Sequence, residues 1–147
     1  GTGKTYSAYL LDPDLFEVPA PNAHGGSLWF DGYAGEQTIL IDEYTGWIQI
    51  ATLRKLLDPW SPPKSVQVKG GSLPYRARRT ILTSNTHPFR WHPHTTLRDL
   101  KALTRRITRA YFFDEEGAHK VDLEAKRQEY CASFQEHEPL PHGLVLQ

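Results

Sequence analysis

This sequence contains almost no cysteine and has no excess of charge of either sign. The 147 residues include one cysteine, Cys131, so neither an internal disulfide framework nor a zinc site made of cysteines can form. The formal net charge at pH 7 is +0, which excludes a histone-like polycation. Any binding of nucleic acid must therefore use a local basic patch.

Long apolar runs are also missing. No stretch approaches the roughly 18 apolar residues that a membrane-spanning helix needs, and no secretory signal pattern opens the chain. We therefore expect no membrane partner and a reducing compartment such as the cytosol or nucleus, with which the single cysteine agrees. The length is enough for one compact domain with a hydrophobic core.

Lysine and arginine are concentrated in one part of the chain. Between residues 64 and 109 the one acid is Asp99, and the basic residues there are Lys64, Lys69, Arg76, Arg78, Arg79, Arg90, Arg98, Lys101, Arg105, Arg106 and Arg109. The segments on either side carry more acids than bases. Segregation of this kind indicates a functional basic face.

Hydrophobic patterning predicts strands that alternate with helices. The predicted strands are 15–18, 38–41, 65–68, 80–83 and 110–113. The predicted helices are 6–11, 48–57 and 97–108. This alternation favours an α/β fold with a central parallel sheet and flanking helices. We expect the core to span residues 1–113, with 114–147 as a C-terminal appendage or tail.

The first five residues match the end of a phosphate-binding loop. Gly3-Lys4-Thr5 fits the last three positions of G-x-x-x-x-G-K-[ST], and Gly1 and Thr2 precede them. In such a loop Lys4 reaches the β- and γ-phosphates of ATP, and the Thr5 hydroxyl ligates Mg²⁺. The leading glycine of the pattern is missing, so we expect an N-terminally truncated P-loop. The alternative is a chance G-K-T in an ordinary loop.

Two of the predicted strands end in residues that suit ATP hydrolysis. Asp42 and Glu43 follow the strand at 38–41, where Asp42 supports Mg²⁺ and Glu43 polarises the attacking water. Asn85 follows the strand at 80–83, where its amide senses the γ-phosphate. The alternatives are two solvated acids after a buried strand, and a Ser-Asn turn. The order of the three motifs favours the ATPase interpretation.

Two basic elements follow. The pattern around Gly70-Gly71 predicts a hairpin that turns at these glycines and carries Lys69 at its tip, where it suits a phosphate backbone. Arg106, on the predicted helix 97–108, is placed to stabilise charge on a phosphoryl group bound by a neighbouring subunit. An exposed turn with incidental charge, and a solvated or DNA-facing basic helix, remain the alternatives.

In this order the motifs resemble the superfamily 3 helicase domain of replication-associated (Rep) proteins from circovirus-like, circular single-stranded DNA viruses. The resemblance runs from Gly1 to about Phe113. Its most specific pieces are Trp29-Phe-Asp-Gly-Tyr-Ala-Gly-Glu36, Ile41-Asp-Glu-Tyr-Thr-Gly-Trp47, Val68-Lys-Gly-Gly71, Thr83-Ser-Asn85 and Arg105-Arg-Ile-Thr108. It implies an AAA+-like P-loop ATPase that forms a homo-oligomer, a hexameric ring around single-stranded DNA.

The resemblance also implies residue roles and an activity. It matches the channel hairpin to residues 69–71, the sensor to Asn85, and the arginine finger to Arg106, with Arg105 as the neighbouring alternative. The implied function is a motor that couples Mg-ATP hydrolysis to translocation on DNA and its unwinding in rolling-circle replication, in the host nucleus. The intact parent is expected to have endonuclease and nucleotidyltransferase activity in a domain that has no convincing match here.

Two other functions remain open. An RNA helicase of a small RNA virus shares the ATPase motifs, although Asp31-Gly-Tyr33 and Lys69-Gly-Gly71 favour the DNA virus. The other is a non-enzymatic nucleic-acid-binding remnant, against which the intact Lys4, Glu43 and Asn85 argue. Stimulation of ATP turnover by single-stranded DNA or by RNA distinguishes the two helicases, and absence of turnover indicates the remnant.

Overall fold

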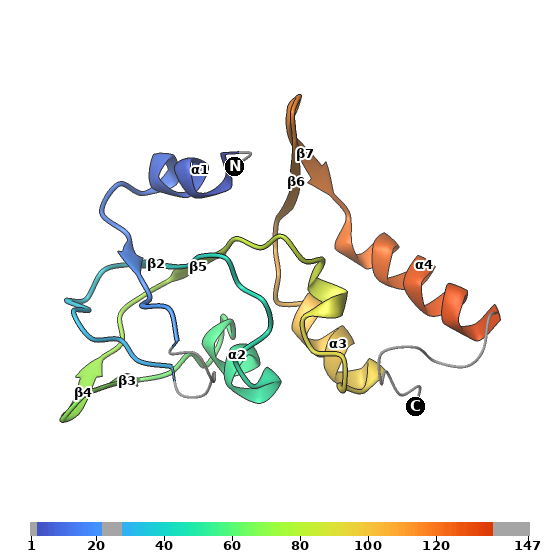
Figure 1. The fold of residues 1–147 in the computed structure, drawn as a ribbon. Helices are drawn as coiled ribbons and strands as arrows, with labels where there is room; N and C mark the ends of the chain where they lie inside the picture. Colours follow the sequence, from blue (N-terminus) through green and yellow to red (C-terminus); the bar gives the residue numbers. More distant parts are fainter. Residues whose placement is uncertain (1–2, 22–27, 137–147) are drawn as a thin grey trace. The chain divides into compact units, whose positions relative to one another are not determined.

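A computed structural model describes residues 3–21 and 28–136 (Figure 1). The chain forms two compact units that divide after Thr86. The elements of the N-terminal unit are α1 (Lys4–Leu11), β1 (Phe16–Glu17), β2 (Thr38–Ile41), α2 (Ile50–Leu56), β3 (Ser65–Val68), β4 (Gly71–Pro74) and β5 (Arg79–Leu82). Those of the C-terminal unit are η1 (Pro88–Arg90), α3 (Leu97–Thr104), β6 (Ala110–Asp114), β7 (Gly117–Val121) and α4 (Leu123–Glu136). Among the described helices, none combines the length and apolarity that crossing a membrane requires.

A three-stranded parallel sheet in the order β1-β2-β5 forms the centre of the N-terminal unit (Figure 1). All four residues of β2, the middle strand, are buried, as expected of a strand that is covered on both faces. The register pairs Ile39 with Thr80 and Ile41 with Leu82. A parallel sheet accompanied by helices confirms the prediction of an α/β fold.

Helix α1 packs one small side chain against the sheet. Ala8 is 2% exposed and forms a core cluster with Leu15 and Leu40, against which Ile81 packs. Gly3 caps the helix with a φ of 89°, a left-handed conformation that favours glycine. Because Leu40 belongs to β2 and Ile81 to β5, this contact places α1 against the two strands that carry the predicted ATPase residues.

Helix α2 is shorter than the predicted 48–57. It begins at Ile50, because the preceding residue caps it in an extended conformation with a ψ of 139°. Its buried residues are Leu53 and Leu56, whereas Ile50 and Leu57 are half-buried. Since the helix has only seven residues, Leu57 falls at its C-cap.

Strands β3 and β4 form an antiparallel hairpin with a two-residue turn (Figure 1). The register pairs Val68 with Gly71, so Lys69 and Gly70 are the turn residues. The prediction that Gly70 and Gly71 form the turn is therefore wrong by one residue. Gly70 has the positive φ of the turn, 89°, which glycine adopts without a steric cost, and Gly71 already belongs to β4.

Helix α3 ends at Thr104, four residues before its predicted end. Arg105 is the C-cap, and the N–H of Arg106 donates to the carbonyl of Leu103 at 3.0 Å, an i to i−3 bond that closes the helix. The Thr104 hydroxyl donates to the carbonyl of Lys101 at 3.2 Å, a local bond of the kind that competes with helix propagation. Arg105 and Arg106 therefore lie in a turn after the helix, which corrects their predicted place on it.

The C-terminal unit has its own small core. Phe89 and Leu100 are 4% and 1% exposed, and Leu97 and Tyr130 pack against them. Strand β6 pairs with β7, which the sequence did not predict, in an antiparallel hairpin, and α4 follows. The expected division after residue 113 thus falls near the tip of this hairpin, whereas the two compact units divide after residue 86.

Candidate functional site

The carboxyl ends of β2 and β5 lie side by side, because the two strands are parallel and in register. Backbone hydrogen bonds continue the pairing past the ladder. The N–H of Thr83 donates to the carbonyl of Ile41 at 3.1 Å, and the N–H of Tyr44 donates to the carbonyl of Thr83 at 2.7 Å. The polar residues that follow the two strands, Asp42 and Asn85, are therefore brought to one edge of the sheet.

The first turn of α1 contacts both strand ends. Lys4 Nζ donates to Asn85 Oδ1 at 2.9 Å, and Thr5 Oγ1 donates to Asp42 Oδ1 at 2.8 Å. These bonds join residues that are 81 and 37 positions apart in the sequence. The structure thus brings together four of the residues that the sequence associated with ATP.

The N-terminus of α1 is also directed to this edge. Gly3 is its N-cap, and a Cβ built on Gly3 would meet nothing within 4 Å. In the described part of the chain no side chain caps the helix, so the N–H groups of its first turn can bind another acceptor. A helix N-terminus carries partial positive charge, which favours an anion such as phosphate. Gly1 and Thr2, which the sequence assigned to the same loop, lie outside the described residues.

Thr83 belongs to the site, although the sequence pointed to it only as part of a motif. Its side chain is 6% exposed. Its hydroxyl donates to Asp42 Oδ1 at 2.5 Å and accepts the N–H of Glu43 at 2.9 Å. One hydroxyl can form both bonds, because it has one donor and two acceptor lone pairs. Thr83 therefore orients the carboxylate of Asp42 and the backbone of Glu43. The signal in the sequence was a hydroxyl residue two positions before Asn85.

Glu43 has a strained backbone. Its φ of 52° lies in the left-handed region, and no other non-glycine residue that the structure describes has a positive φ. Such a conformation costs on the order of 1–3 kcal/mol and persists where its surroundings enforce it. The bond from its N–H to Thr83 does so here, and the Glu43 side chain remains exposed. The fold, and not the intrinsic conformational preference of glutamate, therefore sets the left-handed backbone of Glu43.

The oxygen atoms at this edge are of the type that Mg²⁺ prefers as ligands. Mg²⁺ takes oxygen ligands at about 2.1 Å in octahedral geometry, which spaces neighbouring ligand oxygens about 2.9 Å apart. The Thr5 hydroxyl and the Asp42 carboxylate are 2.8 Å apart. This separation is also that of an ordinary O–H···O hydrogen bond, so what the site offers a hard cation is the oxygen chemistry of Thr5 and Asp42, the two residues predicted to hold it.

Lys69 is placed apart from this set. It lies at the turn of the β3–β4 hairpin with its side chain exposed, and Gly70 and Gly71 follow it. The hydrogen bonds that join Lys4 and Thr5 to the strand ends do not include it. The structure therefore presents a polar edge of the sheet and a basic hairpin as two separate features of the N-terminal unit.

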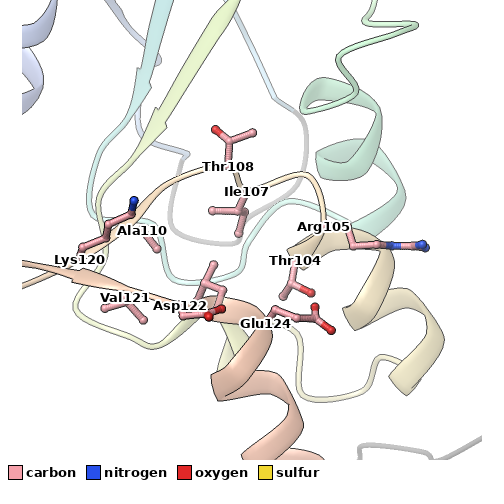
Figure 2. Close-up of a pocket in the computed structure, with 10 residues that line it drawn as sticks. Thr104, Arg105, Ile107, Thr108, Ala110, Lys120, Val121, Asp122 and Glu124 are labelled. Carbon is pink, nitrogen blue, oxygen red and sulfur yellow. The ribbon is translucent and has the colours of Figure 1, made fainter.

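The predicted arginines lie in the C-terminal unit. Arg106 Nη1 donates to the carbonyl of Ala102 at 2.7 Å, which caps the end of α3. Arg105 is exposed and lines an open cleft of about 540 Å³ (Figure 2), together with Lys120. Figure 2 shows these two side chains at opposite ends of the group of lining residues. The described contacts thus engage Arg106 in the fold and leave Arg105 the more accessible of the pair.

The acids of the same cleft are already paired within the C-terminal unit. Asp122 Oδ1 accepts the N–H of Ala125 at 3.1 Å at the start of α4, and Glu124 pairs with Arg127. The Arg127 guanidinium beside Glu124 holds the pKa of that carboxyl below its usual range. None of the residues that line the cleft belongs to the set around Asp42. The cleft is therefore not the predicted nucleotide site.

Comparison with known proteins finds homologues over most of the chain. It is 35% identical over 131 residues to the Replication-associated protein of Porcine circovirus 2, which covers 84% of the chain and 40% of that protein. It is 36% identical over 140 residues to that of Porcine circovirus 1, covering 91% and 43%. It is 33% identical over 93 residues to that of Beak and feather disease virus, covering 63% and 31%. The chain spans about two fifths of the length of the first two relatives. No family model matches it.

Replacing Thr83 by valine keeps the shape of the side chain and removes its hydroxyl. The Glu43 N–H then loses its acceptor and the Asp42 carboxylate loses a donor. We expect the free energy of unfolding to fall by about 1–3 kcal/mol, whereas Thr83→Ser should retain most of it. Urea denaturation followed by circular dichroism measures the difference. Equal stability of the valine and threonine proteins would contradict the role assigned to this hydroxyl.

Proposed function

Since this chain is homologous to the replication-associated proteins of circoviruses and related circular single-stranded DNA viruses, we propose that it is an ATP-dependent helicase motor of viral DNA replication in the host nucleus. Under this proposal its fold is a P-loop ATPase of the AAA+-like superfamily 3 type. The observation that carries the proposal is the meeting of Lys4, Thr5, Asp42 and Asn85 at the carboxyl edge of a parallel sheet. Ligands of open α/β sheets bind at this edge.

In this proposal the first turn of α1 binds the phosphates of ATP. The Lys4 ammonium and the first N–H groups of the helix supply positive charge and donors to the β- and γ-phosphates. Lys4 and Asn85 are within hydrogen-bond distance of each other, so a γ-phosphate bound by the Lys4 ammonium would lie close to the Asn85 side chain. Thr5 and Asp42 hold Mg²⁺, which when bound neutralises charge on the phosphate oxygens.

Glu43 is assigned to the attacking water. Its exposed carboxylate directly follows Asp42, and its strained backbone is held by Thr83. As general base it orients the water and accepts a proton while the water oxygen bonds to the γ-phosphorus. The bond from that phosphorus to the bridging oxygen breaks, and ADP and phosphate are released.

The substitutions Lys4→Ala and Glu43→Gln separate binding from turnover. We expect Lys4→Ala to abolish ATP binding, because it removes the ammonium that holds the phosphates. We expect Glu43→Gln to keep binding but to lower turnover by at least about 100-fold, because it removes the base. A fluorescent ATP analogue and phosphate release, measured on the full-length protein, report the two quantities.

A matched control is Lys55→Ala, which removes an exposed lysine on α2 whose ammonium bonds Ser61 at 3.1 Å. It should leave both quantities unchanged. Wild-type turnover in both Lys4→Ala and Glu43→Gln would end the assignment of an ATPase.

Lys69 is assigned to the phosphate backbone of single-stranded DNA. It is exposed at the hairpin turn, and the two glycines that follow carry no side chain that would obstruct a strand of DNA. Three exposed arginines follow β4 in the sequence and add positive charge to that of Lys69. They are Arg76, Arg78 and Arg79. Contacts of this kind tolerate any sequence and weaken as salt is raised.

The substitution Lys69→Ala tests that contact. We expect it to lower DNA-stimulated ATP turnover more than basal turnover, because it acts on the polynucleotide. The slope of log affinity against log salt concentration should fall by about 1. Lys64→Ala is the control, since it removes the same charge at the opposite end of β3. Equal losses of the basal and stimulated rates, or equal effects of the two substitutions, would argue against the assignment.

We further propose that this chain assembles into a homo-oligomer, a hexameric ring. In this ring an arginine of one subunit completes the ATP site of its neighbour. The motif matches this role to Arg106, with Arg105 as the alternative. The contacts described above support the alternative, since Arg106 caps its own helix and Arg105 is exposed.

Mixed oligomers identify the arginine. Subunits with Lys4→Ala should be inactive alone, and so should the variant, Arg105→Ala or Arg106→Ala, that removes the arginine acting on the neighbouring subunit; the variant of the other arginine should retain turnover. Mixing should restore part of the ATP turnover for the arginine that acts across the boundary, because some interfaces then combine an intact Lys4 with an intact arginine. If neither mixture regains turnover, neither arginine acts across a subunit boundary.

A further inference from the structure

The loop at residues 28–36, here called the brace, is hydrogen-bonded to the β3–β4 hairpin. Asp31 Oδ1 accepts the N–H of Lys69 at 2.7 Å, so the carboxylate holds the backbone of the turn residue itself. The N–H of Phe30 donates to the carbonyl of Gln67, two residues earlier in β3, at 2.9 Å. The brace therefore supports the turn from outside the β3–β4 ladder.

A second contact joins the brace to the chain that leaves β4. The Tyr33 hydroxyl accepts the N–H of Arg76 at 3.0 Å and donates to the carbonyl of Glu36 at 2.7 Å. Gly35 lies against the same arginine, since a Cβ built on Gly35 would come within 3.4 Å of Arg76 Cδ. The brace thus contacts the hairpin at its turn and again just after its second strand.

Aromatic packing fixes the brace in place. Phe30 and Tyr33 are 1% and 4% exposed, and their ring centroids lie 5.8 Å apart. Both rings also pack on Tyr75, at 5.9 Å, and on Phe16 of β1. Burial raises the pKa of Tyr75 to about 12. Asp31, which directly follows Phe30, is therefore attached to a rigid support and not to a free loop.

The bond from Asp31 leaves the functional group of Lys69 available. The carboxylate binds the backbone N–H of Lys69, and in the described part of the chain the ammonium group forms no hydrogen bond or ion pair. A charged acceptor makes a stronger hydrogen bond than a neutral one. The backbone of the turn is thereby held while the lysine side chain extends to solvent.

We propose that Asp31 is a positioning residue for DNA binding: its carboxylate fixes the backbone of the hairpin turn so that Lys69 is presented to the phosphate backbone in a set direction. The inference rests on the proposed contact of Lys69 with single-stranded DNA. An acid so near a polyanion-binding lysine otherwise opposes binding, and its bond to the backbone N–H accounts for its presence.

The test compares Asp31→Ala with Asp31→Asn in the full-length protein. Hydrogen exchange of the peptide that contains residues 65–71 reports the turn without reference to DNA. The concentration of an unstructured oligodeoxythymidylate that gives half-maximal stimulation of ATP turnover reports the presentation of Lys69. We expect Asp31→Ala to speed exchange about tenfold and to raise that concentration several-fold, with a smaller effect on the basal rate. Asp31→Asn should keep the exchange rate and the half-maximal DNA concentration close to those of the wild type, because the asparagine amide oxygen still accepts the N–H of Lys69.

Two controls separate positioning from general destabilisation. Asp58 also accepts backbone N–H groups, from Trp60 at 2.9 Å and Ser61 at 3.1 Å, so Asp58→Ala removes a similar bond away from the hairpin. It should change neither quantity. In a protein that already carries Lys69→Ala, the further change Asp31→Ala should raise the DNA concentration no more, because the residue to be positioned is gone.

The outcomes are distinguishable. Faster exchange in Asp31→Ala with an unchanged DNA concentration would overturn the positioning role, and so would unchanged exchange. A full effect of Asp31→Ala in the Lys69→Ala background would overturn it as well. If Lys69→Ala alone does not alter stimulation by DNA, the proposed DNA contact fails, and the exchange measurement still shows whether Asp31 holds the turn.

Discussion

The in-register parallel pairing of β2 with β5 is the constraint on which the candidate site depends. It places the residue after Ile41 beside the residue after Leu82, and Thr83 then links the two strand ends through its backbone and its hydroxyl. A slip of the register would separate Asp42 from Thr83 and leave the strained backbone of Glu43 without its acceptor. The register of the two strands, and not any single residue, therefore brings the polar side chains together at this edge.

Helix α1 adds Lys4 and Thr5 to this edge of the sheet because Ala8, the residue it packs against the sheet, has a small side chain. Ala8 lets the helix approach β2 and β5 closely, and this approach brings Lys4 and Thr5 within hydrogen-bond distance of Asn85 and Asp42. A cation, two hydroxyls, a carboxylate and an amide are thereby joined by hydrogen bonds. The same groups are those that phosphate and a hard divalent cation require.

The brace links this edge to the basic hairpin through the covalent chain. It bonds the hairpin turn through Asp31, and the strand β2 begins two residues after it ends and leads directly to Asp42. The aromatic contacts of Phe30 and Tyr33 anchor the first part of this path. Under the proposed function, the nucleotide site and the polynucleotide contact would therefore share one support.

The sequence by itself determined the strands of the sheet and the order of the motifs, because apolar runs such as 38–41 and turn residues such as Gly70 act through local chemistry. Chain-local patterns also led to errors of one to four residues, at the hairpin turn and at the end of α3, where a register or a side-chain bond decides the boundary. Only the tertiary structure decided that the Thr83 hydroxyl bonds both the Asp42 carboxylate and the backbone N–H of Glu43. It also decided that Asp31 holds the turn at Lys69 and that Arg106 caps its own helix. The first two pairings join residues about forty positions apart, and the third depends on where the helix ends, so no local pattern encodes them.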